Sequence, residues 1–156
     1  MRSIYLLSFV LVALSCNNIE TNTASLHNKI DLWHNAAATA NYNSYFNFIA
    51  EEGIFIGTDI SERWNKKEFS EFSKPYFDNG KAWSFTPKER IIRYSKDKAT
   101  AWFDEILDTW MGECRATGVL VFQEGNWKLA HYQLSVTIDN ELMPQFLELI
   151  NKRQDD

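Results

Sequence analysis

The sequence predicts an α+β fold in which helices gather on one face of an antiparallel sheet. In the N-terminal half, three segments place apolar residues at helical spacing, whereas residues 83–135 contain four strand-type segments joined by short loops. The chain has 156 residues, of which 45% are hydrophobic and 24% are charged, as expected for a globular domain with its own core. We therefore expect one domain, built from helices followed by a meander of strands.

Residues 1–15 have the composition of a secretory leader. After Met1-Arg2-Ser3, the run Ile4 to Leu14 is apolar except for Ser8, and it is shorter than the roughly 20 residues that span a bilayer. Ala13-Leu14-Ser15-Cys16 resembles a bacterial lipobox, which implies cleavage before Cys16 and attachment of lipid to it. The alternative is a plain signal peptide cut near Ser15 that leaves Cys16 free.

Residues 16–25 are polar and lack periodicity, so we interpret them as a tether between a membrane surface and a domain at 26–156. The lipobox resemblance implies a lipid-anchored domain in the bacterial cell envelope, outside the cytoplasm. Asn17 stands where an acidic residue often marks retention in the inner membrane, so the resemblance favours the outer membrane.

The helical half contains three predicted helices and one short strand. The apolar face of the first helix, with Ser25 as N-cap, consists of Leu26, Ile30, Trp33, Ala37 and Ala40. A second, short helix carries Tyr45, Phe46 and Ile49 and ends at Gly53. Ile54–Gly57 is predicted as a strand and residues 58–64 as a turn-rich loop. The third helix covers Lys66 to Asp78 and stops at Asn79-Gly80, and Pro75 indicates a kink or an earlier end.

The strand half contains four predicted strands and a closing helix. The strands cover Trp83–Ser95, Ala99–Leu107, Cys114–Gln123 and residues 125–135. Pro87 favours an edge position or a bulge for the first of them. The last helix covers Glu141–Asn151, with Leu142, Phe146, Leu149 and Ile150 as its apolar set.

Several short stretches together resemble the SnoaL-like branch of the nuclear transport factor 2-like superfamily. These stretches are Gly57-Thr58-Asp59 with Glu62-Arg63-Trp64, Ala101 to Glu105, Cys114 to Val119, and Trp127 to Tyr132. The resemblance covers Leu26 to the C-terminus. It implies a curved antiparallel sheet of four strands plus one short strand, wrapped around three helices as a cone with an internal pocket. It also implies dimerisation through the outer face of the sheet.

Hairpin registers predict which strand residues share a face. A turn near Trp110-Met111 places Glu105 close to Arg115, and a turn at Gly125 places His131 near Val119. The face expected to point inward comprises Trp102, Asp104, Ile106, Cys114, Ala116, Gly118, Leu120, Ala130, Tyr132 and Leu134.

Asp104 is then a lone carboxylate in an apolar setting, which raises the pKa of a carboxyl group and suits it to proton transfer. Ketosteroid isomerase, in the same superfamily, uses an aspartate base in an apolar pocket. The alternative is an Asp104 bound to Arg115, Arg63 or a backbone amide. The residues expected to contact a ligand are Trp33, Trp64, Tyr76, Trp102, Tyr132 and Leu134, and each could instead be a core residue.

The opposite sheet face is expected to meet a second subunit. Its predicted interface residues are Arg115, Thr117, His131 and Gln133. For His131 the alternative is a hydrogen-bonded histidine within the sheet, and a Glu105–Arg115 contact is most simply a cross-strand ion pair.

Composition excludes several classes of function. The net charge of −5, without a basic run, argues against nucleic-acid binding. No glycine-rich phosphate loop occurs, so no cofactor is expected. His27, His34 and His131 lack a completing set of ligands, so no metal is expected either. Cys114 is interpreted as a buried, unreactive thiol.

Three functions remain open at this point. The first is a lipid-anchored domain that holds a small apolar or aromatic molecule, which the 15% aromatic content favours. The second is an enzyme of the isomerase, cyclase or dehydratase type that uses Asp104. The third is a dimerisation module without a ligand.

Overall fold

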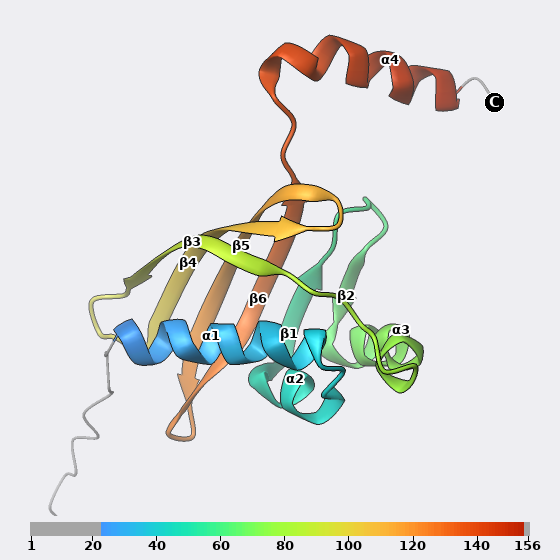
Figure 1. Cartoon of the computed structure of the whole chain (residues 1–156). Coiled ribbons are helices and arrows are strands. Elements are labelled where there is room, and N and C mark those ends of the chain that lie inside the picture. The colour runs from blue at the N-terminus through green and yellow to red at the C-terminus, as the bar shows by residue number, and fades with distance from the viewer. Residues whose placement is uncertain (1–22, 155–156) are drawn as a thin grey trace, which may run out of the picture.

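The computed structural model describes residues 23–154 (Figure 1). Its elements are α1 (Thr23–Ala38), α2 (Tyr42–Phe48), β1 (Ile49–Ile56), β2 (Arg63–Asn65), α3 (Lys66–Asp78), β3 (Thr86–Tyr94), β4 (Thr100–Thr109), β5 (Gly112–Gln123), β6 (Asn126–Val136), the 3-10 turn η1 (Asn140–Leu142) and α4 (Met143–Gln154). The predicted leader, the Cys16 lipid anchor and most of the tether lie outside the described residues. They stay predictions, which release of a Cys16→Ser variant from the membrane fraction would test.

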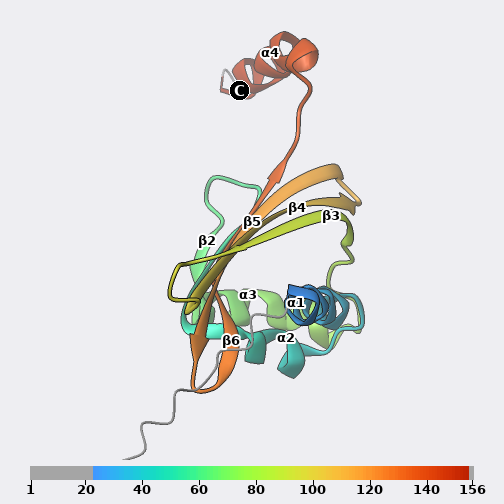
Figure 2. The same cartoon turned by 90° about the vertical axis from the view of Figure 1, so that its left-hand side faces the viewer.

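The six strands form one curved sheet in the order β2-β1-β6-β5-β4-β3. Figure 2 shows α1, α2 and α3 together on its concave side. The predicted α+β class and the curved sheet around three helices are confirmed. The sheet has one strand more than predicted, and it is mixed because β1 runs parallel to β6.

The largest local difference from the sequence prediction lies at residues 49–53. We expected them to end the second helix, but α2 stops at Phe48 and Ile49 begins β1. Gly53 lies inside this strand, where a Cβ atom would approach Ile49 Cγ2 to 2.6 Å. Close packing within this bulged strand therefore requires glycine at position 53. The predicted helix cap at Gly53 is wrong.

Helix α3 has the predicted bounds. Asn65 Oδ1 accepts a hydrogen bond from the backbone N–H of Glu68, and the Glu68 carboxylate accepts one from the backbone N–H of Asn65, so a capping box fixes the start. The helix continues past Pro75 to Asp78, which excludes the earlier end that Pro75 left open as an alternative. The short strand β2 precedes the helix directly and pairs with β1, in a stretch predicted as a loop.

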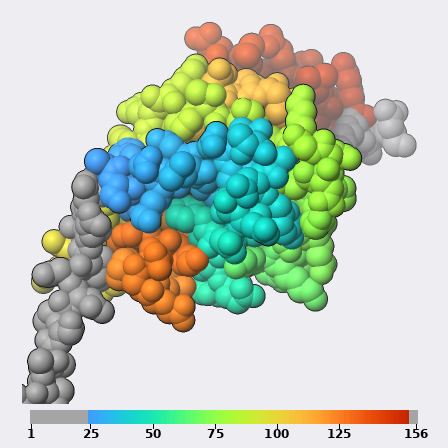
Figure 3. All heavy atoms as spheres, turned by 60° about the horizontal axis from the view of Figure 1, so that its bottom comes forward, coloured from blue at the N-terminus to red at the C-terminus, as the bar shows by residue number. Residues whose placement is uncertain are grey.

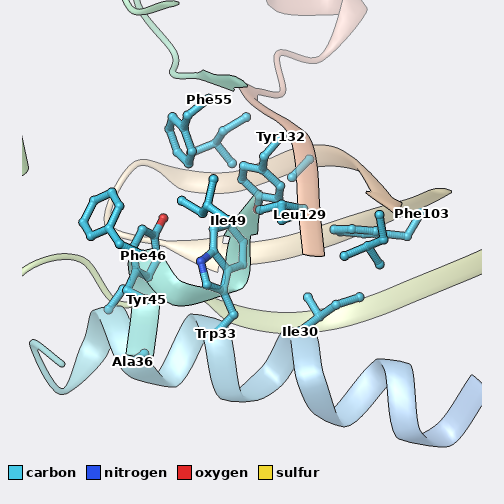
Figure 4. Packing of buried hydrophobic residues seen from close by; sticks show 14 of the residues in the cluster. Ile30, Trp33, Ala36, Tyr45, Phe46, Ile49, Phe55, Phe103, Leu129 and Tyr132 are labelled. Carbon is cyan, nitrogen blue, oxygen red and sulfur yellow. The ribbon is translucent and has the colours of Figure 1, made fainter. Parts of the chain in front are cut away.

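Aromatic rings fill the space between helices and sheet. Figure 3 looks onto the helical side, where α1 and α2 lie side by side. From α1, Trp33 points toward the sheet (Figure 4), stacks on Tyr45 at 4.9 Å and meets the edge of Tyr132 at 4.8 Å between ring centroids. Phe55 stacks on Phe69 at 3.9 Å. Most of the interior that the resemblance assigns to a pocket is therefore occupied by side chains.

The register of β5 and β6 agrees with the prediction, whereas that of β4 does not. Val119 pairs with His131, as expected. Between β4 and β5, however, Thr109 pairs with Gly112 across a two-residue turn, so Glu105 pairs with Ala116 and not with Arg115. Since paired residues share a face, this shift of one residue reverses the predicted faces of β4.

The inward face of β4 therefore carries Ala101, Phe103, Glu105 and Leu107, all of them buried. Trp102, Asp104 and Ile106 lie on the outer face, so their predicted inward placement is wrong. Ala130 is also misplaced. A bulge between Val119 and Leu120 leaves Ala130 unpaired and turns Leu129 inward.

Helix α4 stands apart from the domain at the end of an extended connection (Figure 1). All residues from Asn140 to Lys152 are exposed, including Phe146 and Ile150 on its predicted apolar side. Within residues 23–154, no helix has the length and apolar character needed to cross a bilayer.

Candidate functional site

A buried polar network lies at the centre of the sheet's concave face. The Glu105 carboxylate, on β4, is fully buried, and its Oε1 atom lies 2.9 Å from Nε2 of His34 on α1 and 3.0 Å from the Tyr132 hydroxyl on β6. Nε of Arg90, on β3, donates to Oε2 at 2.7 Å. Four elements far apart in the sequence therefore meet at one carboxylate.

The network fixes the charge of Glu105. Burial by itself would raise its pKa, but the hydrogen bond and charge of His34 and those of Arg90 outweigh burial, so the pKa of Glu105 is lowered. Because an ionised carboxylate only accepts hydrogen bonds, Nε2 of His34 carries the proton between them. Burial, followed by the charge of Glu105, raises the pKa of Tyr132 well above its usual value.

Arg90 extends the network toward the surface. Its Nη1 atom donates to Asp31 Oδ1 at 2.7 Å and to the His27 carbonyl at 3.2 Å, so β3 is held against α1. A carboxylate with a lowered pKa, two paired oxygens and no exposed surface is a weak and inaccessible base. We therefore interpret the network as a structural clamp and not as a reactive site.

An open cleft with a mainly aromatic lining lies at one end of the cone, and we call it the aromatic cleft. Its volume is about 160 Å³. The lining residues are Phe55, Gly57, Thr58, Glu62, Trp64, Phe69, Phe72, Trp83, Phe85, Trp110, Met111 and Leu134. Seven of these carry aromatic rings, so the walls can offer both ring faces and ring edges to a ligand.

Two loops form the mouth of the aromatic cleft. The loop between β1 and β2 contributes Thr58, whose hydroxyl lies 3.9 Å from Met111 Sδ in the β4–β5 turn. Trp110, in the same turn, is 83% exposed, and Phe72 of α3 is 43% exposed. Phe72 also stacks on Trp64 at 4.6 Å. The mouth thus presents large rings to solvent, as ligand-binding surfaces do.

The predicted ligand-contacting residues are divided among three places. Trp64 and Leu134 line the aromatic cleft. Trp33 and Tyr132 belong to the core. Tyr76 lies on the surface of α3, 5.7 Å from Phe72 between ring centroids, and Trp102 is exposed on the outer sheet face.

Asp104 lies on the outer sheet face, where its Oδ1 is 3.6 Å from Nη1 of Arg93. The apolar, inward setting expected for it is therefore wrong, and it has a neighbouring arginine instead. The role of Asp104 in proton transfer stays a prediction, and the apolar surroundings that suggested this role are absent. The predicted ion pair between Glu105 and Arg115 is also wrong, since Glu105 binds Arg90.

The outer sheet face carries all four predicted interface residues. Arg115, Thr117 and Gln133 are exposed and His131 is half-buried, and no helix of residues 23–154 covers this face (Figure 2). Exposed Trp102 and Ile91 lie on the same face, because Ile91 pairs with Asp104 and Trp102 pairs with Val119. The face therefore combines apolar and polar groups.

The clamp around Glu105 and most of the ring residues of the aromatic cleft were not predicted from the sequence. An available signal was the alternation Phe103, Glu105, Leu107, which puts a carboxylate among apolar residues of one face. Cys114 is fully buried, as predicted, and is not in a disulfide. Within the described chain, no three His, Cys, Asp or Glu side chains are placed to hold a metal ion.

Comparison with known proteins identifies the family. Residues 27–139 match the SnoaL-like domain, so the chain belongs to the SnoaL-like family. The match ends in the connection that precedes α4. A search of curated proteins finds no match.

Solved structures share the fold. The nuclear transport factor 2-like protein from Cytophaga hutchinsonii has a TM-score of 0.63 and 17% identity, over 74% of this chain and 98% of that one. A nuclear transport factor 2-like protein of unknown function from Pseudomonas putida has a TM-score of 0.62 and 13% identity, over 76% and 88%. The association domain of CaMKII from C. elegans has a TM-score of 0.61 and 13% identity, over 76% and 98%. At these identities the likeness shows the fold alone.

Proposed function

We propose that this SnoaL-like domain binds a small apolar or aromatic molecule in the aromatic cleft. The observation that carries the proposal is the open cleft of about 160 Å³ walled by seven aromatic residues. Burying a ring there removes apolar surface from water at about 25 cal/mol per Å² and adds ring–ring contacts. A cleft of this volume suits a molecule built around one ring.

Trp110 provides the direct test. Because it is 83% exposed and lines the cleft, Trp110→Ala should leave the fold intact and weaken binding of p-cresol about fivefold, the loss of one ring contact of roughly 1 kcal/mol. Binding is measured by chemical-shift titration of the backbone amides. Ile60→Ala is the matched control, since Ile60 is fully exposed in the neighbouring loop and does not line the cleft. Equal losses in both variants, or no binding by the wild type, would refute the proposal.

We further propose that two copies pair through the outer sheet face. Exposed Trp102 and Ile91 beside Thr117 and Gln133 support this pairing, because an uncovered sheet face with large apolar groups favours association. The CaMKII association domain is a structural neighbour, which is consistent with assembly of this fold.

A charge in the middle of that face should prevent pairing. Trp102→Glu is expected to convert a dimer into a monomer in sedimentation equilibrium, because it buries two unpaired carboxylates across a twofold contact. Trp110→Glu removes a tryptophan that is still more exposed but does not lie on this face, and it should leave the dimer unchanged. A wild-type domain that sediments as a monomer at all concentrations would exclude the interface.

A further inference from the structure

We infer that the aromatic cleft selects an organic cation, namely an ammonium compound with one aromatic ring or a bulky alkyl group, and that the Glu62 carboxylate attracts its charge. This inference rests on the proposed function and narrows the class of ligand that the cleft accepts. It comes from the chemistry of the lining residues and from the position of Glu62.

The wall of the aromatic cleft carries negative charge and no positive charge among its described lining residues. Of the described residues that line it, Glu62 is the one with a charged side chain at neutral pH, and the others are aromatic, aliphatic, glycine, methionine or threonine. Among residues 24–152, no lysine, arginine or histidine nitrogen lies within ion-pair distance of Glu62. The cleft therefore carries a negative charge that no side chain of residues 24–152 neutralises.

The carboxylate of Glu62 is held in place. Its Oε2 atom accepts a hydrogen bond from the backbone of Asp59 at 3.2 Å, while the backbone N–H of Gly57 bonds to the Glu62 carbonyl. Oε2 lies so close over Gly57 that a Cβ atom there would approach it to 2.1 Å. Gly57 lines the cleft, so the glycine makes the room that lets the carboxylate sit against the cleft wall.

The rings add to the same preference. Aromatic faces carry the negative part of the ring quadrupole and attract cations by about 0.5–2 kcal/mol. Trp64, Trp110 and Phe72 present such rings at the mouth. An anionic ligand would meet these faces and the Glu62 carboxylate, and both repel it.

A neutral ligand is also disfavoured relative to a cation. Any ligand that fills the cleft displaces water from Glu62, and removing water from an unpaired charge costs free energy. A cation compensates this cost directly, whereas a hydrocarbon of the same shape does not. The net charge of −5 further raises the local concentration of cations around the domain.

Two probes of nearly identical shape test the inference. N,N,N-trimethylanilinium and tert-butylbenzene differ mainly in charge, and their affinities for the whole mature domain are compared by shift titration of the Trp indole N–H groups. We expect the cation to bind about tenfold more tightly at low salt, and the difference to shrink as salt screens the charge. Benzenesulfonate, an anion with the same ring, should bind most weakly.

Variants assign the preference to Glu62. Glu62→Gln should reduce the ratio of the two affinities at least about threefold and leave the part of the preference that the aromatic rings supply. Gly57→Ala, which keeps the charge but displaces the carboxylate, should reduce the preference. Glu124→Gln removes one charge from the exposed β5–β6 turn, outside the cleft, and should leave the preference unchanged.

The outcomes separate the two proposals. If both probes bind equally well to the wild type, the cleft is a binding site but the preference for cations is refuted. A preference as large in Glu62→Gln as in the wild type, or one that falls equally in Glu124→Gln, also refutes the role of Glu62. If none of the three probes binds, the proposed function itself fails.

Discussion

Replacement of Glu105 by glutamine is expected to lower the free energy of unfolding by about 3 kcal/mol, measured by urea denaturation at pH 7. Glu105 is an ionised, fully buried carboxylate that receives hydrogen bonds from His34, Tyr132 and Arg90. Removing one partner of a buried ion pair costs about 3–5 kcal/mol, because the remaining charge stays buried and unpaired. In the variant, the buried Arg90 guanidinium loses its buried carboxylate partner and keeps only the more exposed Asp31 as a charged partner, so we expect a cost at the lower end of that range.

The effect should depend on pH in a defined direction. Since the pKa of Glu105 is lowered from its usual value of 4.5 in the folded state, ionisation of Glu105 stabilises the fold above pH 4.5. That stabilisation is lost as the pH falls through the lowered pKa. The difference in unfolding free energy between wild type and Glu105→Gln should therefore be largest above pH 4.5 and should narrow at more acidic pH.

Two further variants provide a smaller expected loss of stability and a control for Glu105→Gln. Tyr132→Phe removes one donor to the same carboxylate and should cost about 1 kcal/mol. Glu89→Gln, at an exposed site on β3, should change stability by less than about 0.5 kcal/mol. A Glu105→Gln variant as stable as Glu89→Gln at pH 7 would contradict the clamp.

Gly118→Ala is expected to destabilise the domain by about 1–3 kcal/mol, although alanine favours a strand more than glycine does. Gly118 lies on the inward face of β5, directly opposite Phe103 on β4. A Cβ atom at this position would approach the Phe103 ring to 2.3 Å, far inside van der Waals contact. The Phe103 ring is buried and lies 6.2 Å from the Tyr132 ring between centroids, so a shift of the Phe103 ring would disturb the packing around it.

A double-mutant cycle with Phe103→Leu tests this cause. The smaller side chain should relieve the overlap, so the two substitutions together should cost at least about 1 kcal/mol less than the sum of their separate costs. Thermal and urea unfolding of the four proteins provide the measurement. Additive costs would show that strand conformation, and not the Phe103 ring, makes glycine necessary at position 118.

Local sequence patterns predicted those elements whose signals lie within a few residues of each other. The apolar spacing of Lys66–Asp78, with Asn65 and Glu68 at its start, gave the bounds of α3. The turn predicted at Gly125 gave the right pairing of His131 with Val119, although the structure reaches this pairing through a two-residue turn between Gln123 and Asn126 and a bulge between Val119 and Leu120. A capping box and a tight turn are made by neighbours in the chain, so the sequence contains all the information that they require.

The aromatic cleft was predictable only in part. Trp64 and Leu134 were expected to contact a ligand, whereas Trp83 and Trp110 were not. These rings come from a loop and a turn, and their positions relative to each other depend on how the sheet curves. A high aromatic content predicts that rings will pack together, but it does not distinguish the rings that fill the core from those that border open space.

The sequence by itself determined the class of fold, the family, and the order of helices and strands apart from the short strand β2. Only the tertiary structure decided that Asp104 points outward and Glu105 inward, because one residue of register at the Trp110-Met111 turn reverses a whole strand. Likewise, only the tertiary structure joined Glu105 to Arg90 and His34, 15 and 71 positions away. Contacts at such separations depend on the packing of whole elements, and a pattern along the chain does not encode them residue by residue.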